Sequence, residues 1–358
     1  MNAQARFLRI VSGDEAGPVA AAARAGLGAL SPLYRAAVGA RNWAYDRGWR
    51  SSKTLARPVI SVGNLTAGGT GKTPVVAWLC ERLHERGIRP AILLRGYKAA
   101  PGQKGDEQRL LEGLLGPGTP VEADPDRAAA AERVLARSPG VQAFVLDDGF
   151  QHRRVQRDVD LVLIDATQPF GHGRLLPRGL LREPISSLRR AYAVLITRAE
   201  PEDPRILPLR ETIARRTSAP VFQCRFAVDR IVDAGGALVS VAGRPVHAVC
   251  GIGNPRSFLE KLQRAGANVR DHAIFADHHA YTPADVQRIS AAARQSGALV
   301  VTTTKDWVKI RSLWPSDAAG RIAILEQRLE FQDGQETGLL NVIVPALTRP
   351  GDRPSAPA

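Results

Sequence analysis

A glycine-rich segment in the first quarter of the chain constrains the possible fold more than any other feature. Residues 61–74 read SVGNLTAGGTGKTP. A short β-branched run, 58–62, comes before the glycines, and a helical pattern over 72–86 follows them. Between a strand and a helix, such a turn lets backbone N–H groups converge on phosphate oxygens, and the helix N-terminus adds a favourable dipole. The sequence therefore predicts a nucleotide phosphate-binding loop.

The residues of this loop have separate expected roles. Lys72 is placed to reach the β- and γ-phosphates, and the hydroxyl of Thr73 is placed to ligate Mg²⁺. The general pattern begins with glycine where this chain has Thr66, so two later glycines must supply the backbone freedom. We expect ATP to contact the contiguous residues Thr66, Ala67, Gly68, Gly69, Thr70, Gly71, Lys72 and Thr73.

A pair of aspartates, Asp147 and Asp148, follows the apolar run 141–146. A metal-organising aspartate lies at the end of a strand in nucleotide hydrolases with this type of loop. Adjacent carboxylates are also a common feature of a strand end that faces solvent, so the assignment depends on the loop. We expect Asp147, Asp148 and Thr73 to hold Mg²⁺, with Asp147 the closer partner and Asp148 positioning it.

The segment 19–49 combines alanine-rich helical sequence with aromatic and basic side chains. Ser31 and Pro32 predict a helix start, with serine as the cap and proline in the first turn. Tyr, Trp and Arg residues then alternate, as in a helix that lies in a membrane interface. A helix packed on the rest of the protein would show a similar pattern. No run of 18 apolar residues occurs in the chain.

Short apolar runs and helical patterns alternate along the rest of the chain, which predicts a parallel sheet covered on both faces. The pattern changes near 225, where two extended segments surround a Gly-Gly pair, and a second alternation follows. We therefore predict an α/β fold with a P-loop NTPase-like core, a mostly parallel sheet and a smaller second α/β domain joined by a short β linker. The predicted divisions are an N-terminal membrane-associated helical segment 1–50, a P-loop domain 51–225, a β linker 226–240, a second α/β domain 241–347 and a disordered tail 348–358.

The chain is strongly basic, with 49 Lys and Arg residues against 35 Asp and Glu and a net charge of +14. This excess suits a polyanionic partner, although an arginine-rich proteome would give the same balance. No basic run is interleaved with stacking aromatics, so we expect no nucleic-acid partner. The three cysteines lie far apart and have no metal-ligand spacing, which is typical of a reducing compartment.

Several separated motifs together resemble the tetraacyldisaccharide 4′-kinase (lipid A 4′-kinase) family. They extend in order over about 58–310, and the threonine at the start of the phosphate loop is part of the resemblance. One departure is Gln108, which stands where the family has proline. The motifs are Val62 to Pro74, Arg95-Gly96-Tyr97, Gly105-Asp106-Glu107, Asp147-Asp148-Gly149-Phe150-Gln151-His152, Phe170 to Gly173, Leu176 to Gly179, Leu181 to Pro184, Gly251 to Pro255, Asp277-His278 and Thr304 to Lys309.

The resemblance implies an ATP- and Mg²⁺-dependent transfer of the γ-phosphate to the 4′-hydroxyl of an acylated glucosamine disaccharide 1-phosphate, in lipid A biosynthesis. It also implies a place at the cytoplasmic face of the bacterial inner membrane, peripheral or anchored on that anionic surface by the N-terminal helix. In this resemblance Asp106 is the base for the acceptor hydroxyl, His278 is its partner and Lys72 binds the transferred phosphate. Further substrate or second-lobe candidates are Arg95, Gln151, Arg182, Asp277 and Lys305.

A P-loop GTPase or ATPase of the metallochaperone-like class remains the alternative, because it would share the loop and the aspartates. A guanine-specifying Thr-Lys-x-Asp element would need aspartate where this chain has Trp307. Tryptophan at this position disfavours GTP as the bound nucleotide.

Overall fold

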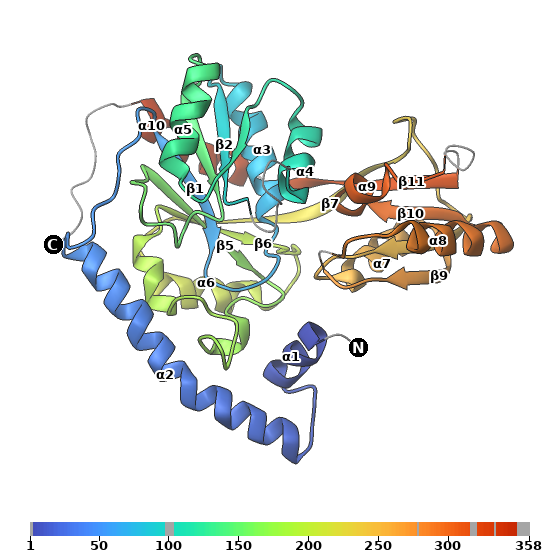
Figure 1. The fold of residues 1–358 in the computed structure, drawn as a ribbon, viewed down its shortest axis with the longest axis horizontal. Coiled ribbons are helices and arrows are strands. Elements are labelled where there is room, and N and C mark those ends of the chain that lie inside the picture. The colour runs from blue at the N-terminus through green and yellow to red at the C-terminus, as the bar shows by residue number, and fades with distance from the viewer. Residues whose placement is uncertain (1–2, 97–103, 278, 316–320, 333, 349–358) are drawn as a thin grey trace. The chain divides into compact units, whose positions relative to one another are not determined.

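The structure is a computed structural model that describes residues 3–96, 104–277, 279–315, 321–332 and 334–348. The chain forms two compact units, Met1–Arg225 with Leu329–Ala358, and Phe226–Arg328. The strands β7 and β11 carry the chain out of the first unit and back into it (Figure 1).

The first unit is built on a parallel sheet with the strand order β3-β2-β4-β1-β5-β6-β7. Every residue of β1, β2, β4, β5 and β6 is buried, as the near-continuous apolar runs predict for a sheet covered on both faces. The elements of this unit are α1 (Ala3–Ser12), α2 (Pro18–Asp46), β1 (Val59–Asn64), α3 (Lys72–His84), β2 (Pro90–Leu94), α4 (Asp106–Leu115), β3 (Val121–Ala123), α5 (Arg127–Arg137), β4 (Ala143–Asp147), β5 (Val159–Asp165), η1 (Gly171–Gly173), η2 (Ile185–Arg190), β6 (Ala193–Thr197), α6 (Ile206–Ala214) and α10 (Gln335–Thr348). The strands β7 (Val221–Asp233) and β11 (Ile322–Phe331) are each divided between the two units.

Two apolar layers enclose this sheet. Helices α3, α4 and α10 pack on one face of it, and α5 and α6 pack on the other. The alternation along β1 shows this division, because Ile60 lies in the core beneath α3 while Val59 lies in the core beneath α5. The carboxyl ends of β1, β4, β5 and β6 therefore meet at one edge of the sheet, where ligands bind in folds of this kind.

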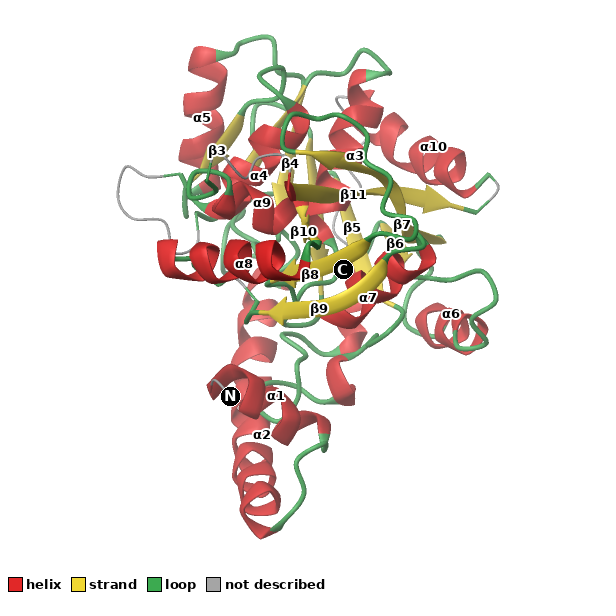
Figure 2. Ribbon diagram, turned by 90° about the vertical axis from the view of Figure 1, so that its right-hand side faces the viewer, coloured by secondary structure: helices red, strands yellow, loops and turns green. Residues whose placement is uncertain are grey.

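Helix α2 is a single helix of 29 residues that lies along the outside of the first unit, with α1 beside it (Figure 1 and Figure 2). The predicted start at Ser31 is wrong: α2 begins at Pro18, and Pro32 lies inside it. The hydroxyl of Ser31 donates to the carbonyls of Leu27 and Leu175 instead of capping a helix. Among the described residues, no helix is both long and apolar enough to cross a membrane.

The second unit is a smaller α/β sheet with the order β11-β10-β8-β9, all parallel. Helix α7 packs in one apolar core of this unit and α8 in the other. Its elements are β8 (Pro245–Cys250), α7 (Pro255–Arg264), β9 (Asn268–Ile274), α8 (Pro283–Ser296), β10 (Leu299–Thr303) and α9 (Thr304–Ile310).

The C-terminal helix α10 corrects the predicted extent of the second domain, 241–347. Leu339, Leu340 and Ile343 are buried in the core that also contains α3, so α10 belongs to the first unit. The chain returns because β11 extends from one unit into the other, a relationship that no local sequence signal contains. Apart from Thr348, the predicted tail 348–358 lies outside the described residues.

Candidate active site

The phosphate loop joins β1 to α3, as the sequence predicts. Its backbone turns at Gly68 (φ 120°) and Gly71 (φ 83°), and α3 begins at the next residue, Lys72. Both glycines have left-handed φ values that a side chain would strain. The N–H of Ala67 donates to the carbonyl of Leu180 at 2.7 Å, so the outer segment of the loop is held by the chain that follows η1.

Asn64, the last residue of β1, organises the inside of the loop. Its fully buried amide Nδ2 donates to the carbonyl of Thr66 at 2.9 Å and to its hydroxyl at 3.2 Å. Its Oδ1 accepts from Nζ of Lys72 at 3.2 Å. The threonine in place of the usual glycine is thus bonded by its side chain to the strand end. We did not predict a role for Asn64, although a polar residue at the end of a buried strand is a signal for one.

Asp148 lies at the centre of a polar cluster beside Lys72. Nζ of Lys72 lies 3.4 Å from Oδ1 of Asp148, and the Arg182 guanidinium donates to both carboxylate oxygens at 3.0 and 2.8 Å. Gln151 accepts from Arg182 at 3.3 Å and donates to the backbone of Asn64 at 2.9 Å. Burial raises the pKa of Asp148, but the charges of Lys72 and Arg182 outweigh it and hold that pKa below its usual value. The structure therefore brings together four residues that the sequence placed in one site.

Asp147 lies opposite Val62 in the register between β4 and β1 and is only 5% exposed. Its Oδ1 is buried and has no hydrogen-bond partner. Burial and then the charge of Glu107 raise the pKa of this carboxyl to about 7, against the opposing effect of Lys72. An unpaired carboxylate oxygen in such a place is costly unless a cation satisfies it.

The donor set fits Mg²⁺ bound together with a nucleotide. Among the residues that the structure describes, no group of three or more His, Cys, Asp or Glu side chains could hold a metal by itself. Mg²⁺ in nucleotide sites typically uses one or two carboxylates and completes its coordination with phosphate oxygens and water. Asp147, with the hydroxyl of Thr73 at the start of α3, would supply the protein part of such a site.

Residues at the ends of β5 and β6, which lie on the other side of β1 from β4, support the phosphate loop. The Thr197 hydroxyl donates to the carbonyl of Thr70 at 2.9 Å, and the Arg198 guanidinium donates to the carbonyl of Gly69 at 3.1 Å. Arg198 also pairs with Asp165 at the end of β5. We did not predict these bracing residues, because each is an ordinary polar residue at a strand end until the sheet order places it beside the loop.

A buried arginine, Arg127, is a further residue that sequence reasoning missed. It begins α5, is 2% exposed, and donates to the carbonyl of Asp124 at 3.0 Å. Burial and the charge of Arg95 lower its pKa to about 10, while Asp147 and Asp148 act in the opposite direction. The predicted candidate Arg95 therefore lies close enough to Arg127 for its charge to act on that guanidinium.

The predicted base, Asp106, is the first residue of α4, and its neighbour Glu107 is one of the charges that raise the pKa of Asp147. In the second unit, Asp277 pairs with Nζ of Lys305 at 2.8 Å. The predicted partner His278 lies outside the described residues. The pairing of Asp106 with His278 therefore stays a prediction.

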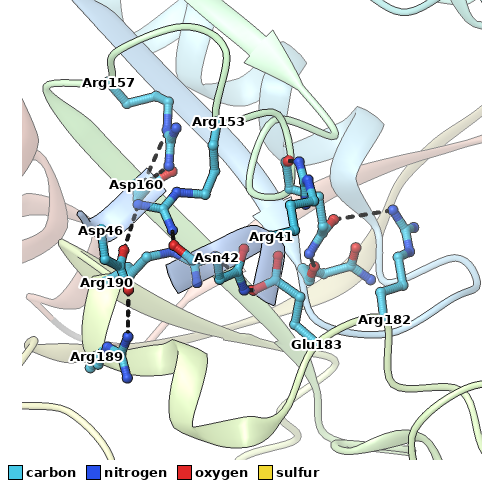
Figure 3. Close-up of polar contacts among 12 residues, drawn as sticks. Arg41, Asn42, Asp46, Arg153, Arg157, Asp160, Arg182, Glu183, Arg189 and Arg190 are labelled. Atoms are coloured by element: carbon cyan, nitrogen blue, oxygen red, sulfur yellow. Dashed lines mark hydrogen bonds and ion pairs between the residues drawn. The ribbon is translucent and has the colours of Figure 1, made fainter. Parts of the chain in front are cut away.

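Helix α2 is attached to the site by a network of polar contacts, drawn in Figure 3. The amide of Asn42 donates to the buried carboxylate of Glu183 at 3.0 Å, which also accepts from Arg190 at 2.9 Å. The Arg41 guanidinium donates to the carbonyl of Gln151. Arg153 donates to the carbonyl of Asn42 at 3.0 Å. The helix thus contacts both segments that flank the Asp148 cluster.

A family model described as "Tetraacyldisaccharide-1-P 4'-kinase" matches residues 23–344. The chain belongs to this family. A protein of Anaeromyxobacter dehalogenans named "Tetraacyldisaccharide 4'-kinase" is 39% identical over 90% of this chain and 91% of its own length. One of the same name from Halothermothrix orenii is 36% identical over 79% of this chain and 82% of its own length.

The crystal structure of the family member LpxK from Aquifex aeolicus, in complex with ATP, is similar over 90% of this chain and 99% of its own, with a TM-score of 0.71 and 30% identity. The α/β fold with a P-loop core and the assignment as a kinase, both expected from the sequence, are confirmed. The alternative of a metallochaperone-like GTPase or ATPase is not favoured, because the family match covers both units.

Proposed function

We propose that this kinase transfers the γ-phosphate of ATP to the 4′-hydroxyl of a tetraacyldisaccharide 1-phosphate, giving the 4′-phosphorylated lipid A precursor. One observation carries the proposal: in a chain of this family, Lys72 at the end of a phosphate loop lies beside an aspartate pair on the neighbouring strand. The loop accounts for the phosphoryl donor, and the name shared by the relatives supports the acceptor.

On the donor side, backbone N–H groups of the loop bind the phosphates and Lys72 binds the group that is transferred. Asp147 and Thr73 would hold Mg²⁺, which when bound supplies neutralisation of the charge on the phosphate oxygens. Asp148, held by Arg182, also pairs with Nζ of Lys72 and so positions this lysine.

On the acceptor side, a carboxylate must accept the proton of the sugar hydroxyl as its oxygen attacks phosphorus. Asp106 is our candidate for this base and His278 for its orienting partner. The position of Asp106 at the start of α4, next to Glu107, supports the proposal because the charge of Glu107 already acts on Asp147. Arg95, Asp277 and Lys305 remain substrate candidates.

The acceptor is a lipid, so the enzyme has to work at a membrane surface, which we propose is the cytoplasmic face of the inner membrane. Helix α2 and the turn after it expose large apolar side chains beside arginines, the composition of an interfacial helix. Cations on such a helix favour anionic lipids. The exposed apolar side chains of α2 and this turn are Val19, Leu30, Leu33, Trp43 and Trp49, and α1 adds Leu8.

A phosphotransfer assay tests the proposal. With ATP labelled at the γ-phosphate and tetraacyldisaccharide 1-phosphate in mixed micelles, the label should move to the lipid, and Lys72→Ala should abolish the transfer. Release of the label as inorganic phosphate, with none in the lipid, would instead support an ATPase.

A further inference from the structure

A cleft of about 410 Å³ opens at the C-terminal end of α2. Tyr45 and Trp49 line it from the end of the helix and the turn that follows. Lys53 and Arg154 line it from two neighbouring segments, which pair at a β-bridge between Lys53 and Val155. His152, four residues after Asp148 in the chain, also lines it. All of these residues belong to the first unit.

The cleft differs from its surroundings in its unbalanced charge. Arg50, Lys53 and Arg154 line it, and none of the three forms an ion pair with a described residue. The arginines just outside the cleft are, by contrast, matched to carboxylates: Arg153 and Arg189 to Asp46, Arg157 to Asp160 and Arg190 to Glu183. An excess of cations that form no ion pair with described residues favours an anionic ligand in this cavity.

The one carboxylate in the lining, that of Asp126, offsets only part of the charge of the three cations. Asp126 caps α5, and its Oδ1 accepts from the N–H groups of Ala128 at 3.0 Å and Ala129 at 3.2 Å. These bonds hold the pKa of Asp126 below its usual value, with a smaller contribution from Lys53. The cleft therefore presents a net positive charge to a ligand.

The cleft is also connected to the catalytic edge through short stretches of chain. Arg127, next to Asp126, acts electrostatically on both aspartates of the site. His152 follows the loop that carries Asp148 and Gln151. Arg153, between two lining residues, fixes this loop to Asp46 in the last turn of α2 (Figure 3). The cleft is thus linked through adjacent residues of the chain to the Asp148 cluster, and it lies at the C-terminal end of the helix proposed to meet the membrane.

We propose that this cleft binds a phosphate monoester, and that in the reaction it holds the 1-phosphate of the acceptor disaccharide through Arg50, Lys53 and Arg154. This inference rests on the proposed function. Arg and Lys are the side chains that bind phosphate through charge-assisted hydrogen bonds. Holding the phosphate at one end of the disaccharide selects acceptors that carry it and orients the hydroxyl at the other end.

The test compares two acceptors, the tetraacyldisaccharide with and without its 1-phosphate, in neutral detergent micelles. Lys53→Ala and Arg154→Ala should each raise the KM for the phosphorylated acceptor about tenfold, as expected for loss of one charge-assisted bond. The KM for ATP and the KM for the dephosphorylated acceptor should stay as in the wild type. Lys53→Arg, which keeps the charge, should retain most of the affinity. Arg216→Ala, an exposed charge after α6, is the matched control and should change neither KM.

Each contrary outcome has a distinct meaning. An equal rise in KM for both acceptors, or no rise, would overturn the cleft assignment while leaving the kinase activity in place. If the variants lose binding to anionic phospholipid vesicles without acceptor, yet discriminate the two acceptors normally, the cleft binds a membrane headgroup and the proposal is wrong. Failure of the wild-type enzyme to label either acceptor would overturn the proposed function itself.

Discussion

The phenol of Tyr34 donates a hydrogen bond of 2.9 Å to the carbonyl of Arg182, the residue whose guanidinium holds Asp148. The same helix, α2, reaches the neighbouring Glu183 through Asn42 and the carbonyl of Gln151 through Arg41. The helix also exposes Leu30 and Leu33. The helix that we propose to lie on the membrane is therefore also a structural support for the cluster around Lys72.

We expect the loss of this support to lower kcat more than it alters the KM for ATP. Tyr34→Phe removes one hydrogen bond and keeps the ring, and should cost a few-fold in kcat, in line with about 1 kcal/mol for a neutral bond. Asn42→Ala leaves the buried Glu183 carboxylate short of a donor and should cost more. Steady-state kinetics with Arg216→Ala, an exposed charge outside α2, as the control would check both. A pure rise in the KM for ATP would contradict a role in aligning the Asp148 cluster.

The affinity for Mg²⁺ should increase as the pH rises through 7. Burial raises the pKa of Asp147 to about 7, so this carboxyl is mostly protonated at lower pH and cannot ligate a metal. Between pH 6 and pH 8 its ionised fraction grows about tenfold. Mg²⁺ titrations with a non-hydrolysable ATP analogue should show this change, after subtraction of the pH dependence of Asp147→Asn. A pH-independent difference between the two proteins would rule out titration of Asp147.

The sequence predicts the donor side of the site well because its signals are local. The strand, the glycines and Lys72 are contiguous, and Asp148, Gln151 and Arg182 stand in motifs that the fold then brings together. Residues whose role depends on long-range packing were missed. Arg127 looks like a solvent-facing charge on an alanine-rich helix, and its burial beside Arg95 depends on how α5 packs on the sheet.

Two errors in the sequence-based prediction have the same physical origin: contacts between residues far apart in the chain override the local signal. Ser31 and Pro32 form a good local helix start, but the hydroxyl of Ser31 bonds to the carbonyl of Leu175 and the helix continues through both residues. Helix α10 was assigned to the second domain from its position in the sequence. Its apolar face instead packs with α3, because β11 returns the chain to the first unit.

Membrane binding should depend on the exposed apolar side of α2. Replacing Leu30 and Leu33 by Gln together removes apolar surface that is exposed in the structure, so folding should be little affected. Binding to vesicles that contain anionic lipid should fall about tenfold or more, as measured by co-sedimentation. The matched control is Leu207→Gln, an exposed leucine on α6. Equal binding by wild type and the double variant would remove α2 from the membrane contact.

Removing the proposed base should stop turnover but leave nucleotide binding intact. Asp106→Ala should lower kcat by about 10² or more, the scale of general-base catalysis, with unchanged ATP affinity by calorimetry. His278→Ala should show a smaller loss, since it acts through the base. Near-normal turnover of Asp106→Ala would eliminate this residue from the reaction, and wild-type activity of His278→Ala would break the proposed pair.

The position of the new phosphate in the product is the most direct measurement of the central claim. After incubation of the wild-type enzyme with ATP, Mg²⁺ and tetraacyldisaccharide 1-phosphate, ³¹P NMR of the extracted lipid should show a second phosphomonoester. Its coupling should identify the proton at the 4′ carbon of the distal glucosamine, and Lys72→Ala should give no such signal. A lipid that keeps only its 1-phosphate while ATP is consumed, or one phosphorylated at another position, would contradict the assignment.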